Sequence, residues 1–304
     1  MKKFLFALAA MALLVSCSSS SDDNNDPVDP VDPVQPADTI LCANSAMTIV
    51  TYDETGLTVP TEVTKRNAVI EEYTGINCGY CPQGHKVVND IMKEYPGQVF
   101  GINIHCGGYA ANTYTTTEGD AYEGIATDLT GYPSGSVNRH SFSGKYALSR
   151  GAFEEAAERI IAMDAPVNLV ATAEIEQATR TLTVKVRGLY TVEQAVATNS
   201  LYVFILQDNV IGQQSGASGN PEQVVEGGKY RHMHMLRTCI TGTWGQEITP
   251  VVGTSFDRTY TYVIPAQLGI KPIDAVLEDL KVVVCMAEGQ KEILQVIEPK
   301  MVLK

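Results

Sequence analysis

The spacing of apolar residues changes near residue 165, and the two halves of the chain predict different kinds of structure. In the first half, runs rich in Val, Ile and Tyr alternate with segments whose apolar residues recur at helical spacing. This alternation is typical of an α/β domain. We expect strands over 47–52, 67–73, 98–105 and 134–139, and helices over 79–94, 118–129 and 149–163.

Almost no helical pattern remains after Pro166. Short strand-like runs are separated by clusters of Gly, Asn, Pro and Asp, which predicts an immunoglobulin-like β-sandwich. The folded part therefore divides into an α/β domain over 39–165 and an all-β domain over 166–304, an α+β chain as a whole. We expect strands over 167–176, 181–190, 200–208, 229–241, 256–264, 280–288 and 293–298.

Residues 1–17 read as a targeting segment rather than as part of the fold. Two lysines precede an apolar run over 4–15, which is too short to span a bilayer. The run ends in LVSC at 14–17, which resembles the lipobox of bacterial lipoproteins, in which the cysteine carries the lipid. The alternative is an ordinary signal peptide with a chance cysteine. A lipid on Cys17 would hold the protein at a membrane without a spanning helix.

Residues 18–38 read as a disordered link between the lipid and the folded part. The Ser-rich and acidic tract over 18–26 resembles the export signal of surface lipoproteins in Bacteroidetes, although it also fits a solvated spacer. Proline recurs at every third position over 27–36, which favours polyproline II and a semi-rigid stalk. We therefore expect an outer-membrane protein that faces the cell surface rather than the periplasm.

Charge and cysteine content narrow the classes of function. The formal net charge of −13 argues against binding to nucleic acid and against electrostatic binding to anionic lipid. Seven cysteines are present, and six remain besides Cys17. An even number outside the cytoplasm permits disulfides, although the sequence does not give their pairing.

The motif Cys-Gly-Tyr-Cys at 78–81 carries the clearest chemistry. A zinc site would need a second pair of ligands at suitable spacing, and c-type haem would need His where Pro82 stands. A strand followed by CxxC and a helix fits thiol–disulfide exchange instead, because a helix N-terminus stabilises a thiolate. Cys78 would attack and Cys81 would resolve. The cysteine pair is itself the redox group, so no cofactor and no metal is expected.

Residues 67–163 resemble the thioredoxin fold, and the dipeptide Gly79-Tyr80 is the variant found in bacterial periplasmic disulfide isomerases. The resemblance implies that Tyr132-Pro133 is the cis-proline site, with Pro133 against the disulfide and Tyr132, Gly79 and Tyr80 facing a substrate. It also implies that Glu72 is the buried acid that assists proton transfer. A solvated strand residue is the alternative for Glu72. Asn77 replaces the family's tryptophan, which puts thioredoxin-like substrate handling in doubt.

Three stretches carry a narrower resemblance: EEYTGINCGYCPQGH at 71–85, GYPSGSVNR at 131–139 and YRHMHMLR at 230–237. They resemble the outer-membrane-protein-28-related lipoproteins of Bacteroidetes. The resemblance implies an outer-membrane lipoprotein with a thioredoxin-like domain followed by a β-rich domain. Its implied partners are the membrane, through the lipid on Cys17, and protein thiols or disulfides. It implies neither a particular substrate nor an oligomeric state.

Several residues outside the motif have two readings. Cys239 and Cys285 fall in predicted strands and would form a structural disulfide or remain buried thiols. Cys106 would pair with Cys42 or be a buried thiol. The histidines of the 229–241 strand, at 232 and 234, would lie on one face, as a polar sheet face or an interface rather than a metal site. His85 is expected on the helix surface.

The function remains divided between two classes. The first is thiol–disulfide exchange on extracytoplasmic proteins through Cys78 and Cys81. The second is a binding, adhesion or assembly lipoprotein in which the CxxC disulfide is structural, since a fold does not determine a function.

Overall fold

The computed structural model describes residues 38–43, 46–289 and 291–304. The targeting segment 1–17 with Cys17, and the link as far as residue 37, lie outside the described residues. Within the described part of the chain, no helix combines the length and the apolar character that a membrane crossing requires.

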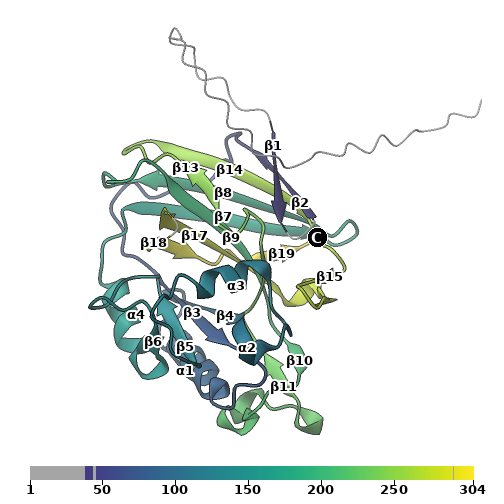
Figure 1. The fold of residues 1–304 in the computed structure, drawn as a ribbon. Helices are drawn as coiled ribbons and strands as arrows, with labels where there is room; N and C mark the ends of the chain where they lie inside the picture. Colours follow the sequence, from purple (N-terminus) through teal and green to yellow (C-terminus); the bar gives the residue numbers. More distant parts are fainter. Residues whose placement is uncertain (1–37, 44–45, 290) are drawn as a thin grey trace, which may run out of the picture. The chain divides into compact units, whose positions relative to one another are not determined.

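Two large β-sheets dominate the fold (Figure 1). The six-stranded sheet has the order β1 (Thr39–Ala43), β2 (Ala46–Thr51), β14 (Ser255–Val263), β8 (Thr181–Tyr190), β7 (Val167–Glu176) and β19 (Met301–Leu303). The nine-stranded sheet has the order β18 (Ile293–Ile297), β17 (Leu280–Glu288), β9 (Asn199–Gln207), β12 (Met235–Cys239), β4 (Val99–His105), β3 (Ala68–Thr74), β5 (Ser134–Val137) and β6 (Leu148–Ser149), and β13 (Gln246–Ile248) pairs with β9.

Short elements complete the described chain. Two small hairpins pair β10 (Val210–Gly212) with β11 (Tyr230–His232), and β15 (Gln267–Leu268) with β16 (Ile273–Asp274). The α-helices are α1 (Cys81–Glu94), α2 (Gly107–Ala110), α3 (Thr117–Glu123) and α4 (Phe153–Ile161). The 3₁₀ turns are η1 (Arg150–Ala152), η2 (Ala217–Gly219), η3 (Pro221–Gln223), η4 (Glu226–Gly228) and η5 (Leu277–Asp279).

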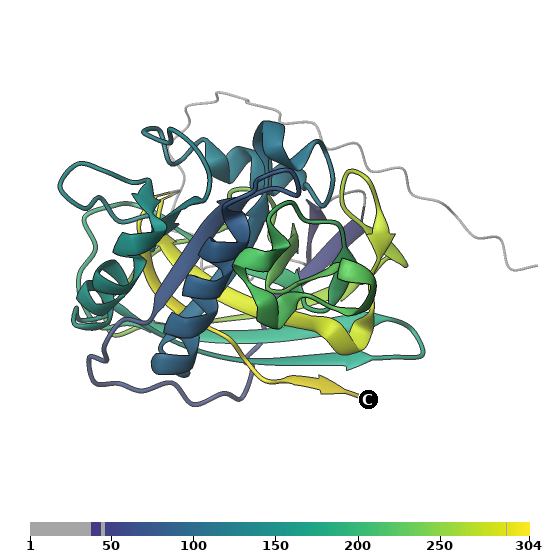
Figure 2. The same cartoon turned by 90° about the horizontal axis from the view of Figure 1, so that it is seen from below.

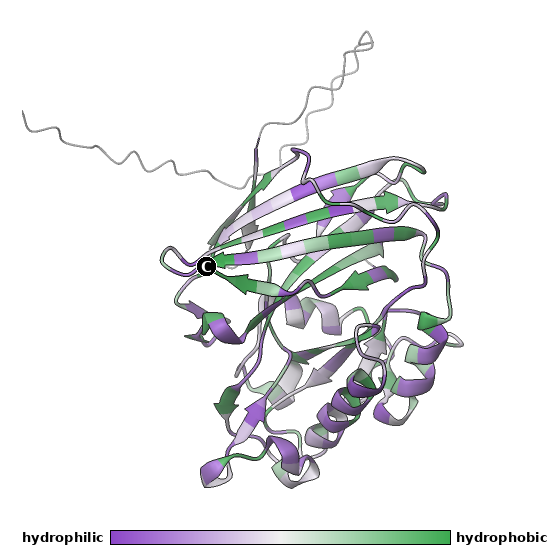
Figure 3. Ribbon diagram, turned by 180° about the vertical axis from the view of Figure 1, so that it is seen from behind, coloured by the Kyte–Doolittle hydropathy of each residue, from purple (hydrophilic) through white to green (hydrophobic). Residues whose placement is uncertain are grey.

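The central strand β9 explains why one run of the sequence is apolar at almost every position. Alternate side chains of β9 enter two different cores, with Val203 in the core between the two sheets and Phe204 in the core on the opposite face. A strand covered on both faces needs apolar residues at successive positions. The strand β8 of the six-stranded sheet instead alternates, with Val184 and Val186 buried and the intervening positions more exposed (Figure 3).

Helices cover both faces of the β4–β3–β5 part of the larger sheet. Val88 of α1 and Phe153 of α4 join a core against Ala68 and Ile70 of β3. On the other face, Tyr122 of α3 packs in the core that contains Phe204. The parallel pairing of β3 with β4 needs a crossover, and α1 supplies it.

The two expected domains share their sheets. Strands of 167–304 supply two facing sheets, as a sandwich would, but each sheet continues into strands from the first half. The strand β12 pairs with β4 through Met235 and Asn103, while β2 pairs with β14. Pairing of a free strand edge satisfies backbone groups that would otherwise be left open. The described residues accordingly fall within one compact unit, because strand pairing joins the parts of the chain before and after residue 165.

Most predicted elements are present, although several differ in their bounds and one strand is broken. The helix expected over 118–129 ends at Glu123, and the helix expected from residue 79 begins at Cys81. The strand expected over 229–241 is broken into β11 and β12, because His234 adopts a left-handed conformation with φ of 53°. The edge strands β1 and β19 were not predicted, since short edge strands leave a weak pattern.

Candidate functional site

The Cys78–Cys81 pair lies at the turn between β3 and α1. The two cysteines form a disulfide, with Cα atoms 5.4 Å apart. The Cys78 N–H donates to the Gly75 carbonyl at 3.0 Å, and Pro82 stands in the first turn of the helix. Cys78 therefore precedes the helix, and Cys81 is its first residue, so the helix begins two residues later than the sequence predicts.

Both cysteines are buried, whereas the dipeptide between them is open to solvent. Cys78 is 2% exposed and Cys81 is fully buried, but Tyr80 is 66% exposed. The expected substrate-facing position of Gly79 and Tyr80 agrees with this exposure. Cys78, which the sequence predicts to be the attacking cysteine, is therefore not at the surface.

The segment 213–229, which we call the strap, covers the disulfide. It joins β10 to β11 and carries the turns η2, η3 and η4. The Gln214 side-chain amide donates to the carbonyl oxygens of Gly75 and Cys78 at 3.1 and 3.0 Å. Figure 2 shows this segment, in green, alongside α1.

Glu72 lies in the middle of β3 and is fully buried. Neither carboxylate oxygen has a hydrogen-bond partner among the described residues. Burial raises the pKa of this carboxyl well above its usual value, and the charge of Arg150 opposes the rise. An unpartnered buried carboxylate is costly, so Glu72 is favoured as the neutral acid.

Gly84 shows where the Glu72 carboxyl group points. Gly84 lies one helical turn after Cys81 in α1. A Cβ atom at this position would overlap Glu72 Oε1 and would lie 2.9 Å from Cβ of Pro133. Glu72 and Pro133 therefore meet Gly84 beneath the first turns of α1. Gly84 lies on the same helix as Cys81, three residues later.

The peptide bond between Tyr132 and Pro133 is cis, as predicted. Pro133 leads directly into β5, whose Gly135 is the register partner of Glu72. Pro133 is buried. The Tyr132 hydroxyl donates to Glu123 and contacts the Cys106 sulfur, and its ring meets Tyr109 edge-on with centroids 5.5 Å apart. Tyr132 is thus held by its neighbours rather than free.

A buried cluster of histidines and tyrosines continues from the site. His85 Nε2 is 2.9 Å from the Thr74 hydroxyl, and His85 Nδ1 is 2.9 Å from the Tyr230 hydroxyl. Farther along, the His232 ring contacts the rings of Tyr230 and His105. Burial lowers the pKa of His85 to about 3, so this imidazole is neutral near pH 7.

The surface position expected for His85 is wrong. The residue falls on the buried stripe of α1 that also contains Cys81, Val88 and Ile91. Its spacing of four residues from Cys81 and three from Val88 was the available signal. Its partner Tyr230 comes from the other half of the chain and had no local signal.

The two histidines expected on one strand face are separated. His232 ends β11 and lies among aromatic rings, whereas His234 lies in the break before β12, where its N–H donates to Asp208. Among the described residues, no group of three or more His, Cys, Asp or Glu side chains could hold a metal ion.

Cys239 and Cys285 are both free buried thiols, so of the two readings the disulfide is wrong and the buried thiols are confirmed. Cys239 lies on β12 and Cys285 on β17, and these strands flank β9 on opposite sides. Two strand spacings of about 4.8 Å separate them, which exceeds the Cα distance that a disulfide allows. Cys106 is also a free buried thiol, and its sulfur lies 3.5 Å from the Ile104 carbonyl oxygen.

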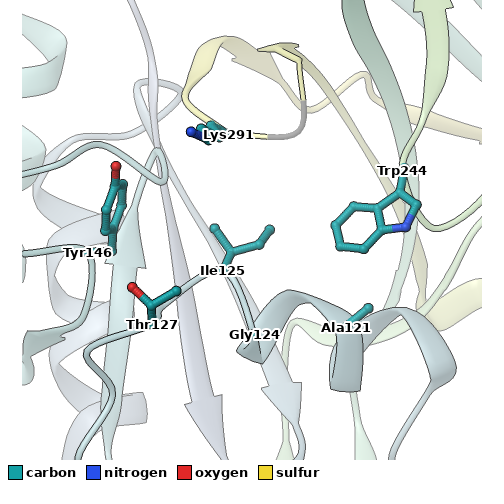
Figure 4. Close-up of a pocket in the computed structure, with 7 residues that line it drawn as sticks. All are labelled: Ala121, Gly124, Ile125, Thr127, Tyr146, Trp244 and Lys291. Carbon is teal, nitrogen blue, oxygen red and sulfur yellow. The ribbon is translucent and has the colours of Figure 1, made fainter.

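A separate pocket of about 450 Å³ lies beside α3 (Figure 4). Trp244 and Tyr146 project into it from different segments, and Lys291 lies above it. The ionisable side chains among its described lining residues are those of Tyr146 and Lys291. Its residues are Ala121, Gly124, Ile125, Thr127, Tyr146, Trp244 and Lys291.

Solved structures of two proteins from Porphyromonas gingivalis are similar to this chain. HBP35 is 20% identical, with a TM-score of 0.61, and the match covers 78% of this chain and 76% of HBP35. A domain of the outer membrane lipoprotein Omp28 is 20% identical, with a TM-score of 0.30, and the match covers 46% of this chain and 91% of that domain. The first similarity concerns the fold alone. A search of curated proteins found no match.

The family model described as outer membrane protein Omp28 matches residues 120–302, more than half of the chain. The match begins within α3 and extends into β19, so it does not include the CxxC motif. The family assignment therefore rests on residues 120–302 and leaves the cysteine chemistry to be argued separately. The chain belongs to the Omp28 family of outer membrane proteins.

Proposed function

We propose that this protein is a lipid-anchored thiol–disulfide exchange protein in which residues 68–161 act as a thioredoxin-type redox module. The observation that carries the proposal is the convergence of three features where β3 meets the first turns of α1. The Cys78–Cys81 disulfide, the buried Glu72 and the cis Tyr132-Pro133 bond all meet α1. The local strand order β4–β3–β5–β6, with β5 antiparallel to β3, agrees with such a module.

The exchange reaction uses both cysteines. In the reduced protein the Cys78 thiolate attacks a substrate disulfide, a mixed disulfide forms, and one substrate thiolate leaves. Cys81 then attacks the sulfur of Cys78, which releases the second substrate thiolate and restores the Cys78–Cys81 disulfide. Two electrons pass from the cysteines to the substrate, and no further cofactor is needed.

Glu72 is the proposed proton acceptor for Cys81. The resolving thiol must lose its proton before it attacks, because the thiolate is the nucleophile. A carboxylate whose pKa is raised by burial is a stronger base than an exposed one, so the ionised form of Glu72 can accept the proton and later return it. Pro133 and Tyr132 would contact the substrate strand, and the exposed Gly79 and Tyr80 would meet it from the helix side.

The anchor proposed for this module is a lipid on Cys17. The LVSC tetrapeptide at 14–17 and the family assignment support a lipoprotein of the outer membrane. We propose that the acidic tract and the proline-rich stalk hold the folded part away from the membrane on the cell-surface side. The substrates would then be extracytoplasmic proteins that carry accessible thiols or disulfides.

A binding or assembly lipoprotein is the second candidate, and one observation favours it. Cys78 is only 2% exposed beneath the strap, so the disulfide could serve as an inert staple while another surface binds a partner. In that case the exposed Tyr80 would be a contact residue rather than part of a redox site.

The reduction potential of Cys78–Cys81, measured against glutathione on the purified protein, separates the two candidates. Exchange proteins have potentials between about −120 and −270 mV, whereas structural disulfides lie below about −300 mV. We expect a potential between about −120 and −270 mV. We also expect a Cys81→Ser variant to trap mixed disulfides with partner proteins. A potential below −300 mV would leave the staple as the correct interpretation.

A further inference from the structure

The strap makes backbone contacts with the CxxC turn rather than lying loosely above it. The Ser215 N–H donates to the Ile76 carbonyl at 2.7 Å, and the Gln214 amide binds the Cys78 carbonyl at 3.0 Å. The first donor is a backbone N–H, like that of an extended polypeptide laid against the turn, and the second is a side-chain amide. The strap therefore occupies the surface that a second chain would need in order to reach the disulfide.

Gly216 brings the strap into direct contact with the motif. It has a φ of +67°, and a Cβ atom there would overlap the carbonyl oxygen of Gly79. Gly219 follows the same path, since its Cβ would lie 2.9 Å from the side chain of Gln83. Side chains are absent at these points because the backbone of the strap packs on the motif itself.

A second set of contacts ties the strap to α1. Asn220 donates to the Tyr230 hydroxyl at 3.2 Å, and that hydroxyl donates to Gln223 at 2.7 Å. The same hydroxyl is 2.9 Å from His85 of α1. The strap is thus anchored at its centre by a buried polar group and at its start by the CxxC turn.

Between these anchors the strap has the character of a segment that opens locally. Most of its side chains are exposed, and its contacts with the motif are hydrogen bonds rather than buried apolar surface. Segments of this kind unfold locally at lower free energy than the core. A pocket of about 400 Å³ already separates part of the strap from the CxxC loop, lined by Ile76, Asn77, Gln213, Gln214, Ser215, Gly227, Gly228 and Lys229.

We propose that the strap is a displaceable cover that controls access to the Cys78–Cys81 disulfide. A polypeptide partner would displace it by offering its own backbone N–H groups to the carbonyls of Ile76 and Cys78. This regulation rests on the proposed exchange function, because a staple needs no cover that moves. It makes the disulfide reactive toward a partner that binds the turn and slow toward other thiols.

The step that the cover limits can be followed with a dithiol reductant such as dithiothreitol. Its thiolate attacks Cys78 and forms a mixed disulfide, and Cys81 leaves as a thiolate that takes up a proton. The second thiol of the reductant then closes onto the first, releasing Cys78. One dithiol is oxidised and one protein disulfide is reduced, so the observed rate reports how readily the sulfur is reached.

The test compares two valine substitutions in the strap. Gly216→Val places a side chain against the Gly79 carbonyl and should lift the strap. Gly227→Val introduces the same left-handed strain, with φ of +76°, but nothing lies within 4 Å of its Cβ. We expect reduction by dithiothreitol, followed by alkylation and mass spectrometry, to be roughly tenfold faster in Gly216→Val and within about twofold of wild type in Gly227→Val.

Gln214→Ala gives a second variant without backbone strain, in case Gly216→Val disturbs folding. It removes the amide that binds Gly75 and Cys78, and we expect reduction roughly threefold faster, with an unchanged circular dichroism spectrum. If Gln214→Ala and a folded Gly216→Val are both reduced by dithiothreitol at the wild-type rate, the proposal that the strap covers the disulfide is wrong.

The cover and the exchange function can fail separately. Faster reduction in the strap variants with a potential below the catalytic window would retain the cover and reject the exchange function. Equal rates with a potential inside that window would retain the exchange function and reject the cover.

Discussion

Glu71 and Glu72 are adjacent acids on β3, and they face opposite sides of the sheet with opposite environments. Glu71 accepts from Arg139 through Nε at 2.8 Å and Nη2 at 2.6 Å, and from the Ser136 hydroxyl at 3.1 Å. The Arg139 guanidinium also lies 4.7 Å from the centre of the Tyr122 ring. Glu72 is equally buried and has no partner among the described residues.

The difference contrasts a paired, structural charge with the unpaired buried acid that we propose as the proton acceptor. A buried ion pair with paired hydrogen bonds holds elements together, and here it joins β3 to the segment after β5 beside the core of α3. A buried carboxyl without partners costs stability and is retained where its proton is used. The face of β3 that carries Glu72 is also the face that meets Gly84 and Pro133.

The largest effect is expected on the Glu71 face. Arg139→Met should lower the free energy of unfolding by about 3–5 kcal/mol, because it leaves the Glu71 carboxylate buried without its partner. Urea unfolding at pH 7 measures this loss. The double variant Glu71→Leu with Arg139→Met is the control and should recover most of the stability, since it removes both charges. A single variant as stable as wild type would contradict the structural role.

On the Glu72 face, removing the acid is expected to raise stability rather than lower it as pH increases. The Glu72 pKa is raised in the folded protein, so above pH 4.5 the folded state binds a proton that the unfolded state has lost. The contribution of Glu72 to the free energy of unfolding therefore falls as pH rises from 4.5 toward the raised pKa of the folded protein, by at most about 1.4 kcal/mol per pH unit. Glu72→Gln removes the titration, so its stability relative to wild type should increase between pH 5 and pH 7.

Activity should move in the opposite direction in the same variant. Without an acceptor for the Cys81 proton, the resolving step of Glu72→Gln should slow by roughly 10- to 100-fold near pH 7. Quenching a single turnover with a model disulfide substrate would show the mixed disulfide accumulating. Unchanged resolution, with the expected change in stability, would leave Glu72 a buried acid without a role in exchange.

The buried histidines predict the acid side of the stability profile. The pKa of His85 falls to about 3 in the folded protein from 6.5, so between these values only the unfolded state binds the proton. Stability supplied by the neutral imidazole is present above pH 6.5 and is lost as pH falls toward 3. His85→Gln keeps partners for Thr74 and Tyr230 and should flatten this loss, measured as urea midpoints at pH 7 and pH 4.5.

Local patterns predicted the elements and the motif, but not which edges meet. The strands β4 and β9 are largely apolar runs, β3 is rich in β-branched and aromatic residues, and α1 has a helical stripe, so short windows of sequence contain them. The pairing of β12 with β4 joins Met235 to Asn103, which no short window shows. This pairing is the reason that two expected domains share one sheet.

The same limit applies to the candidate site. Cys78, Cys81, Glu72 and Pro133 could be proposed because they surround one strand and one helix, and a family resemblance assigns them roles. The strap reaches the site through the β10–β11 hairpin, more than a hundred residues later. The disulfide expected between Cys239 and Cys285 failed similarly, since strand order decides which cysteines are neighbours.

The smallest effect is expected for an exposed ion pair between α1 and the strap. Lys93 Nζ lies 3.2 Å from Glu222 Oε2, and their side chains are 64% and 63% exposed. Water screens such a pair, so Glu222→Gln should leave the thermal unfolding midpoint unchanged and the rate of reduction within about twofold of wild type. A reduction rate as high as that of Gly216→Val would show that surface charge holds the strap. Reduction of the wild-type protein would then accelerate with added salt, whereas a strap held by its buried and backbone contacts should be nearly indifferent to salt.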